Sequence, residues 1–91
     1  MLHIIKTCQA LQEAMPYLTC DDAILLLEDA VYAANEKHQY FPTACHAELF
    51  VLEEDTQARA ITALISERIA RVDYCGFVDL TARHSHSITW G

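Results

Sequence analysis

The chain has 91 residues, of which 53% are apolar, and its 13 acids against 6 bases give a formal net charge of −7. That charge repels phosphate groups, so we expect no direct binding of nucleic acid. No apolar run is long enough to span a membrane and no secretion signal is recognisable, so we expect one cytoplasmic domain over residues 1–91. A small domain this rich in apolar residues often covers the surplus against a partner, so we expect an oligomer.

Apolar runs that alternate with helix signals predict five strands and four helices. The run Ala23 to Leu27 lacks polar alternation, which indicates a strand covered on both faces, as in a parallel sheet between helices. Thr7 and Asp73 stand where side chains cap helix amino termini, and Pro16 disturbs the end of the first helix. The expected elements in chain order are strand 2–5, helix 8–18, strand 23–27, helix 30–36, strand 48–52, helix 56–64, strand 70–72, helix 74–84 and strand 87–90.

The predicted fold class is α/β, a three-layer α/β/α arrangement with a small, mostly parallel sheet of four to five strands and helices on both faces. The stretch 37–45 belongs to no element, and its aromatic residues make it a candidate contact loop. The only two glycines, Gly76 and Gly91, are too few to build a loop that cradles phosphates or a dinucleotide. We therefore expect no cofactor.

Several segments carry a family resemblance, in family order and over nearly the whole chain. They are Leu2-His3, 25–34, Val51-Leu52 leading through Asp55 to 58–60, 72–81 and Thr89-Trp90. On these segments the chain resembles the TusB/DsrH family, small subunits of sulfur-relay complexes in the DsrE-like superfamily. The family usually has glycine at the positions of Ala30 and Ala60, where we expect backbone conformations that alanine tolerates.

The resemblance implies a DsrEFH-like fold and a function in sulfur transfer. TusB-like subunits join TusC-like and TusD-like chains in a heterohexamer, which relays persulfide sulfur for 2-thiouridine formation at the tRNA wobble position. The reacting cysteine of that complex lies on the TusD-like chain, after its third strand, and the corresponding segment 53–58 has no cysteine here. The resemblance therefore implies a non-catalytic structural subunit, not an enzyme.

Two alternatives stay open. One is a DsrH-like subunit of a sulfur-oxidation complex, whose relatives carry a cysteine at the position of Ala14. Cys20 is then the sulfur-carrier candidate, although the acids that follow it disfavour the reactive thiolate. The other is a self-associating α/β binding module without sulfur chemistry, and such a chain forms a homo-oligomer by itself.

The remaining cysteines and the clustered acids have simpler interpretations. We expect Cys8 and Cys75 to be packing residues and Cys45 to be a loop thiol without a role. The acids at 28–29 and 53–55 follow strands, where they can cap helix amino termini. The alternative is that these acids converge on a magnesium ion.

Four polar side chains complete the candidates. Arg59 is expected to meet a carboxylate, within the chain or on a partner. His3 fits either a satisfied buried polar residue or an interface contact. His84 and His86 could share one face of a strand, but two ligands without a third predict no metal site. The aromatic residues expected to supply core or interface area are Tyr74, Phe77 and Trp90.

Overall fold

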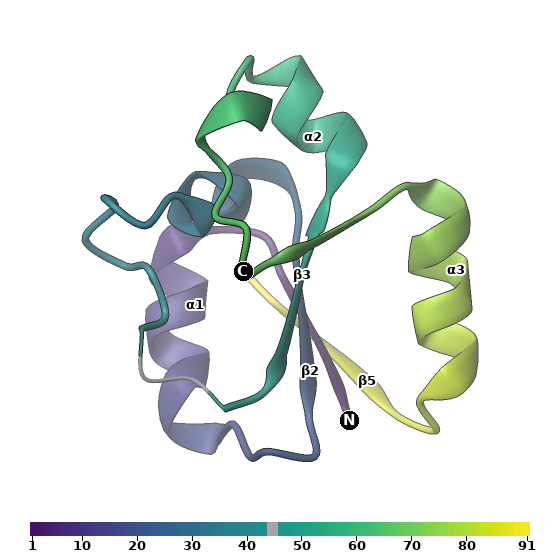
Figure 1. Ribbon diagram of the computed structural model, residues 1–91. Coiled ribbons are helices and arrows are strands. Elements are labelled where there is room, and N and C mark those ends of the chain that lie inside the picture. The colour runs from purple at the N-terminus through teal and green to yellow at the C-terminus, as the bar shows by residue number, and fades with distance from the viewer. Residues whose placement is uncertain (44–45) are drawn as a thin grey trace.

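Five parallel strands form the centre of the molecule (Figure 1). The computed structural model describes residues 1–43 and 46–91, so Cys45 and the end of the candidate contact loop lie outside the described residues. The strands are β1 (Leu2–Ile5), β2 (Ala23–Leu26), β3 (Glu48–Leu52), β4 (Ala70–Val72) and β5 (Ser87–Trp90). Their order is β4-β3-β2-β1-β5, and every neighbouring pair is parallel. The predicted parallel α/β sheet is confirmed.

Helices cover the two faces of this sheet unequally. One face carries helix α1 (Cys8–Ala14) and the 3-10 helices η1 (Met15–Tyr17) and η2 (Glu28–Ala34), whereas α3 (Tyr74–Arg83) lies on the other face (Figure 1). The chain steps from β1 to β4 in one direction and then crosses back to β5, so right-handed crossovers place α3 opposite α1. In the described part of the chain, no helix has both the length and the apolar character needed to cross a membrane.

Two apolar clusters hold the layers together. The larger cluster lies on the α1 side and includes Leu11, Ile24 and Val31, while the smaller one lies beneath α3 and includes Leu25 and Leu80. Every residue of β2 is buried, as the unbroken apolar run predicted. Full burial of one large apolar side chain stabilises the fold by about 1.5–3 kcal/mol. Because β2 contributes Ile24 to the larger cluster and Leu25 to the smaller one, it anchors the helices on both faces of the sheet.

Three helices differ from the prediction. Of the expected helix over 8–18, only Cys8–Ala14 is α-helical, and the 3-10 helix η1 with Pro16 follows, because proline lacks the N–H that would continue the α-helix. The segment after β2 is the 3-10 helix η2, which begins at Glu28, not the expected helix over 30–36. The expected helix over 56–64 is wrong as well: helix α2 spans Glu53–Ala58, and the short 3-10 helix η3 (Thr62–Leu64) follows after a turn.

Ala60 explains why α2 ends so early. Its φ of 56° lies in the left-handed region, the N–H of Ile61 donates to the carbonyl of Thr56, and the N–H of Ala60 donates to that of Gln57. This is a Schellman ending, in which glycine usually holds the left-handed position. Alanine adopts it at a cost of about 1–2 kcal/mol. Ala30 does not have a positive φ, so the backbone at that position suits alanine, as expected. At Ala60 the expectation is wrong, because the backbone there has the positive φ that favours glycine.

Candidate functional site

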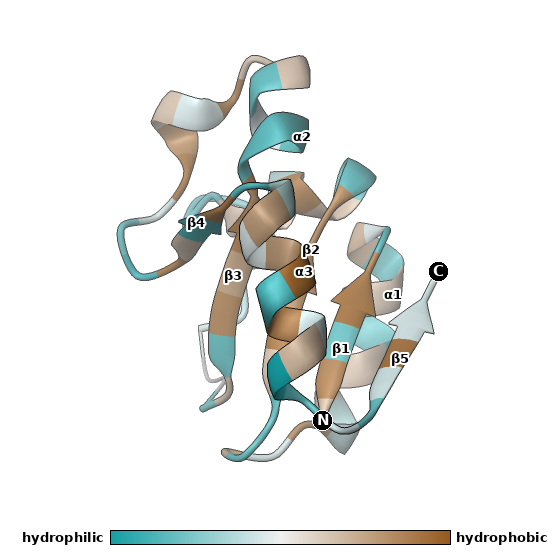
Figure 2. Ribbon diagram, turned by 90° about the vertical axis from the view of Figure 1, so that its right-hand side faces the viewer, coloured by the Kyte–Doolittle hydropathy of each residue, from teal (hydrophilic) through white to brown (hydrophobic). Residues whose placement is uncertain are grey.

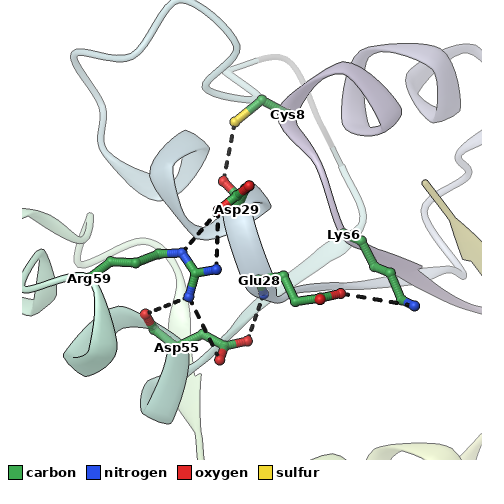
Figure 3. A network of polar contacts seen from close by, with 6 residues as sticks. All are labelled: Lys6, Cys8, Glu28, Asp29, Asp55 and Arg59. Carbon is green, nitrogen blue, oxygen red and sulfur yellow. Dashed lines mark hydrogen bonds and ion pairs between the residues drawn. The ribbon is translucent and has the colours of Figure 1, made fainter.

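The carboxyl ends of β1, β2 and β3 meet at one edge of the sheet, which is where parallel α/β folds usually bind ligands. Six side chains from the segments after these strands form a polar network there (Figure 3). They are Lys6, Cys8, Glu28, Asp29, Asp55 and Arg59. Whether this edge can do chemistry depends on which of these groups are free.

Arg59, which follows α2, is held by carboxylates of two different elements (Figure 3). Its Nε and Nη2 donate to Oδ1 of Asp29 at 3.2 and 3.1 Å. Its Nη1 donates to the main-chain oxygen of Asp55 at 3.4 Å and lies 3.9 Å from Oδ1 of the same residue. The prediction that Arg59 meets a carboxylate is confirmed within the chain. Because the guanidinium is already paired, little of its charge remains for an anionic substrate.

Two acids in the first turn of α2 bind backbone groups of other elements. Oδ2 of Asp55 accepts a hydrogen bond from the N–H of Glu28 at 2.6 Å, at the start of η2. Oε2 of Glu54 accepts one from the N–H of Tyr74 at 3.2 Å, at the start of α3. Capping of amino termini is therefore confirmed for these two acids, although they cap neighbouring elements and not their own helix.

The magnesium interpretation of the same acids finds no support in their arrangement. In residues 1–43 and 46–91, no three His, Cys, Asp or Glu side chains converge where a metal ion could be held. Oε2 of Glu28 instead lies 3.9 Å from Nζ of Lys6, and Asp29 binds Arg59. These carboxylates are arranged around cations and N–H groups of the chain itself.

Cys8 lies beside this network, in the first turn of α1. Its Sγ donates to the main-chain oxygen of Asp29 at 3.5 Å, and the side chain packs half-buried against the larger core cluster. Burial raises the pKa of the Cys8 thiol, a main-chain hydrogen bond from Ala33 partly offsets this, and the charge of Asp29 raises the pKa further. The thiolate is the form of cysteine that attacks a persulfide, and a raised pKa lowers the fraction of thiolate. Its contacts with the core fit the prediction that Cys8 is a packing residue.

The other two described cysteines lie elsewhere. Cys20 is exposed in the turn before β2, at the amino-terminal edge of the sheet, and the fold brings it close to none of the network residues. Its role as a sulfur carrier stays a prediction. Cys75 is exposed in the first turn of α3, so the expectation that it packs is wrong. The helix turns Phe77 and Leu80 toward the sheet instead.

A chain of polar contacts that the sequence did not reveal runs through buried His3 and joins β1, β5 and the residue before β2. Nε1 of Trp90 donates to Nδ1 of His3 at 3.1 Å, and Nε2 of His3 lies 3.1 Å from Oδ2 of Asp22. Because an indole N–H can only donate, Nδ1 must accept, and the proton of the neutral imidazole is on Nε2. His3 is 3% exposed with both nitrogens paired, so it is a satisfied buried residue and not an interface contact.

Asp22 at the end of this chain has further partners. Its Oδ2 also accepts from the N–H of Thr19 at 3.1 Å, and the amino group of Met1 lies 3.3 Å from its Oδ1. Burial opposes the ionisation of Asp22, but the hydrogen bonds from Thr19 and His3 outweigh it and lower the pKa of the carboxyl group. The carboxylate therefore stays charged and holds the turn from Thr19 to Asp22 against Met1 and His3.

Comparison with known proteins agrees with the resemblance read from the sequence. A family sequence model described as "DsrH like protein" matches residues 6–87. Curated relatives include Protein TusB of Yersinia pestis and Protein TusB of Yersinia pseudotuberculosis, each 40% identical over 74 residues that cover 79% of this chain and 78% of the relative. The region matched by the family model contains the whole carboxyl-edge network. The chain therefore belongs to the TusB/DsrH family of sulfur-relay proteins.

Proposed function

We propose that this chain is the non-catalytic structural subunit of a cytoplasmic, TusBCD-like sulfur-transfer complex, in which TusC-like and TusD-like subunits relay persulfide sulfur for wobble 2-thiouridine in tRNA. The observation that supports this most directly is that the first turn of α2 carries acids that bind neighbouring elements. Where the TusD-like chain is expected to hold its reacting cysteine, this chain has Glu53-Glu54-Asp55. Glu54 and Asp55 are occupied with the starts of α3 and η2, so the segment stabilises the fold.

The remaining groups at the carboxyl edge support the same proposal. The raised pKa of Cys8 keeps its sulfur protonated, and Arg59 is paired with carboxylates. The net charge of −7 agrees with contact to tRNA through other subunits. The contribution of this chain is then a surface for its partners and not a reacting group.

Co-expression with TusC-like and TusD-like chains tests this function. We expect one complex containing all three chains in size-exclusion chromatography with light scattering. In cells that lack the native subunit, the wild-type chain and the Cys20→Ser variant should restore 2-thiouridine in tRNA equally, because no cysteine of this subunit carries sulfur. Absence of a complex, with self-association of the isolated chain, contradicts the proposal and favours a binding module without sulfur chemistry.

A second candidate function is that of a DsrH-like subunit in sulfur oxidation, with Cys20 as the sulfur carrier. The observation that favours it is the exposure of the Cys20 thiol, which leaves it open to a donor protein. Mass spectrometry after incubation with a persulfide-loaded donor should then show the mass of one added sulfur atom on the Cys20 peptide. If this peptide gains no mass, the second function is removed.

A further inference from the structure

Among the described residues, one helix covers the α3 side of the sheet, which leaves part of the sheet open (Figure 2). On this side, strand register places Ser87 and Thr89 of β5 level with Leu2 and Ile4 of β1, so the open flank over β5 is polar. The other flank is apolar. It presents Phe50 of β3 and Val72 of β4, both only partly buried.

Hollows next to α3 extend this apolar flank. One of about 440 Å³ lies between the helix and the two strands, with Phe50, Val72 and Asp79 among its lining residues. A second, of about 350 Å³, lies on the outward side of α3 and is lined by Tyr74, Cys75, Val78 and Asp79. Asp79 borders both hollows, so they form one surface. We define the α3 surface as Phe50, Val72, Tyr74, Cys75, Val78 and Asp79.

Several apolar side chains of the α3 surface are exposed to solvent. Val78 is 63% exposed and Tyr74 is 55% exposed, and Cys75 between them also faces solvent. These residues recur at helical spacing on the side of α3 opposite Phe77 and Leu80, so the helix has one apolar face on the sheet and a second one outward. An outward apolar face of this kind is typical of a docking site.

Charges around the α3 surface favour a basic partner over a second copy. Asp79 lies within the surface, and Asp73 and Glu54 lie at the amino terminus of α3. Arg83, at the carboxyl end of α3, lines the first hollow, so acids outnumber bases around the surface by three to one. A second copy related by a twofold axis near Val78 brings Asp79 against its own equivalent, between two chains that each carry −7. Lysine or arginine residues on a different protein replace that repulsion with attraction.

We propose that the α3 surface docks one helix of a partner subunit, with apolar residues along its face and lysine or arginine residues at its rim. This inference rests on the proposed function, which supplies the partner subunits. The docked helix lies across the outward face of α3, on Tyr74, Cys75 and Val78, and reaches the apolar flank over β3 and β4 beyond Asp79. Helix-in-groove binding of this kind relies on a few apolar anchors, with charge at the rim setting the choice of partner.

Substitutions on the α3 surface test the inference in the complex with TusC-like and TusD-like chains. Val78→Lys and Asp79→Lys should each weaken assembly about tenfold or more. Val78→Lys puts a charge into the apolar contact, and Asp79→Lys reverses the charge that faces the basic rim of the partner. Asp79→Asn should weaken it less. Leu64→Lys is the matched control, since Leu64 is 55% exposed but belongs to η3, outside the α3 surface. All three positions are exposed, and thermal unfolding of each of the four isolated variants verifies that it folds.

Alkylation gives a second measurement on the wild-type protein. Cys75 should react with iodoacetamide more slowly in the complex than in the isolated chain, with Cys20 as the internal reference. A complex that forms normally with Val78→Lys and Asp79→Lys, and leaves Cys75 reactive, overturns the inference but not the proposed function. Self-association of the isolated chain that Val78→Lys abolishes also overturns it, because a second copy then occupies the surface. A wild-type chain that binds neither partner overturns both.

Discussion

The indole N–H of Trp90 donates to Nδ1 of His3 at 3.1 Å and so joins the last strand to the first across 87 positions of the chain. Within the part of the chain that the structure describes, β5 is an edge strand paired with β1 alone, so this side-chain bond supplements a single ladder of backbone bonds. The ring of Tyr17 stacks on the same indole at 5.8 Å between centroids. The attachment of β5 therefore combines the backbone ladder to β1 with a hydrogen bond to one buried imidazole, which must be in one tautomer.

Replacing Trp90 by phenylalanine tests this attachment. The ring remains, but Nδ1 of buried His3 loses its donor, so the free energy of unfolding should fall by about 1–3 kcal/mol. Urea denaturation measures the change, and amide hydrogen exchange should show the largest loss of protection in β5. Tyr17→Phe, which keeps a stacking ring, is the control. Equal stability of Trp90→Phe and wild type contradicts a structural role for the hydrogen bond.

Asp22→Asn should make stability less sensitive to acid. The pKa of Asp22 is lowered in the fold, so its carboxylate contributes fully above the unfolded value of about 3.9. This contribution is lost as the pH falls through the lower folded-state pKa. At neutral pH the variant should lose about 1–3 kcal/mol of unfolding free energy, because charged hydrogen bonds to His3 and Thr19 weaken.

Denaturation curves of wild type and Asp22→Asn from pH 7 down to about pH 2 measure the difference, which should narrow below about pH 4. Asp21→Asn is the matched control, since Asp21 is the exposed neighbour and accepts none of these hydrogen bonds. A gap between Asp22→Asn and wild type that stays constant with pH argues against the lowered pKa.

Ala60→Gly should stabilise the protein. Glycine adopts the left-handed φ of Ala60 without the steric cost that alanine has, and the gain outweighs the extra chain entropy of glycine by about 0.5–1 kcal/mol. Thermal unfolding measures the increase. Ala58→Gly, at the last residue of α2, should instead lower stability by up to about 1 kcal/mol. Destabilisation by both glycines shows that the Schellman ending does not strain Ala60.

The pair of Arg59 with Asp29 should be weakly coupled. Asp29 is 71% exposed at its side chain, so solvent screens the pair even though Arg59 is 24% exposed. A double-mutant cycle with Arg59→Met and Asp29→Asn should give a coupling free energy of about 0.5–1 kcal/mol that declines with added salt. The same cycle with Asn35→Ala in place of Asp29→Asn serves as the uncoupled control. Coupling that does not depend on salt indicates a buried, unscreened ion pair.

Cys8 should react more slowly with iodoacetamide than Cys20, and its reaction should need a higher pH. The raised pKa of the half-buried Cys8 thiol lowers the fraction of thiolate at neutral pH. Mass spectrometry of peptides after timed alkylation between about pH 7 and pH 10 measures both rates, a range that spans the ordinary thiol value. Cys8 modified as fast as Cys20 at neutral pH contradicts its assignment as a packing residue.

Local sequence patterns determined most of the elements. The run Ala23 to Leu27 predicted a doubly covered strand correctly, because burial on both faces requires an apolar residue at every position. Thr7 and Asp73 were identified as helix caps, because a capping side chain binds an N–H only three residues further on. The start of α2 was missed, because Glu54 and Asp55 bind segments that only the fold brings near.

The tertiary structure alone decided how the polar residues combine. Arg59 meets Asp29 across 30 positions, and His3 meets Asp22 across 19 and Trp90 across 87. Such pairings depend on strand register and on the side to which each crossover passes, and neither is encoded in local spacing. The side on which α3 lies is decided in the same way, since the crossover to β5 puts it, alone among the described helices, on the face of the sheet opposite α1.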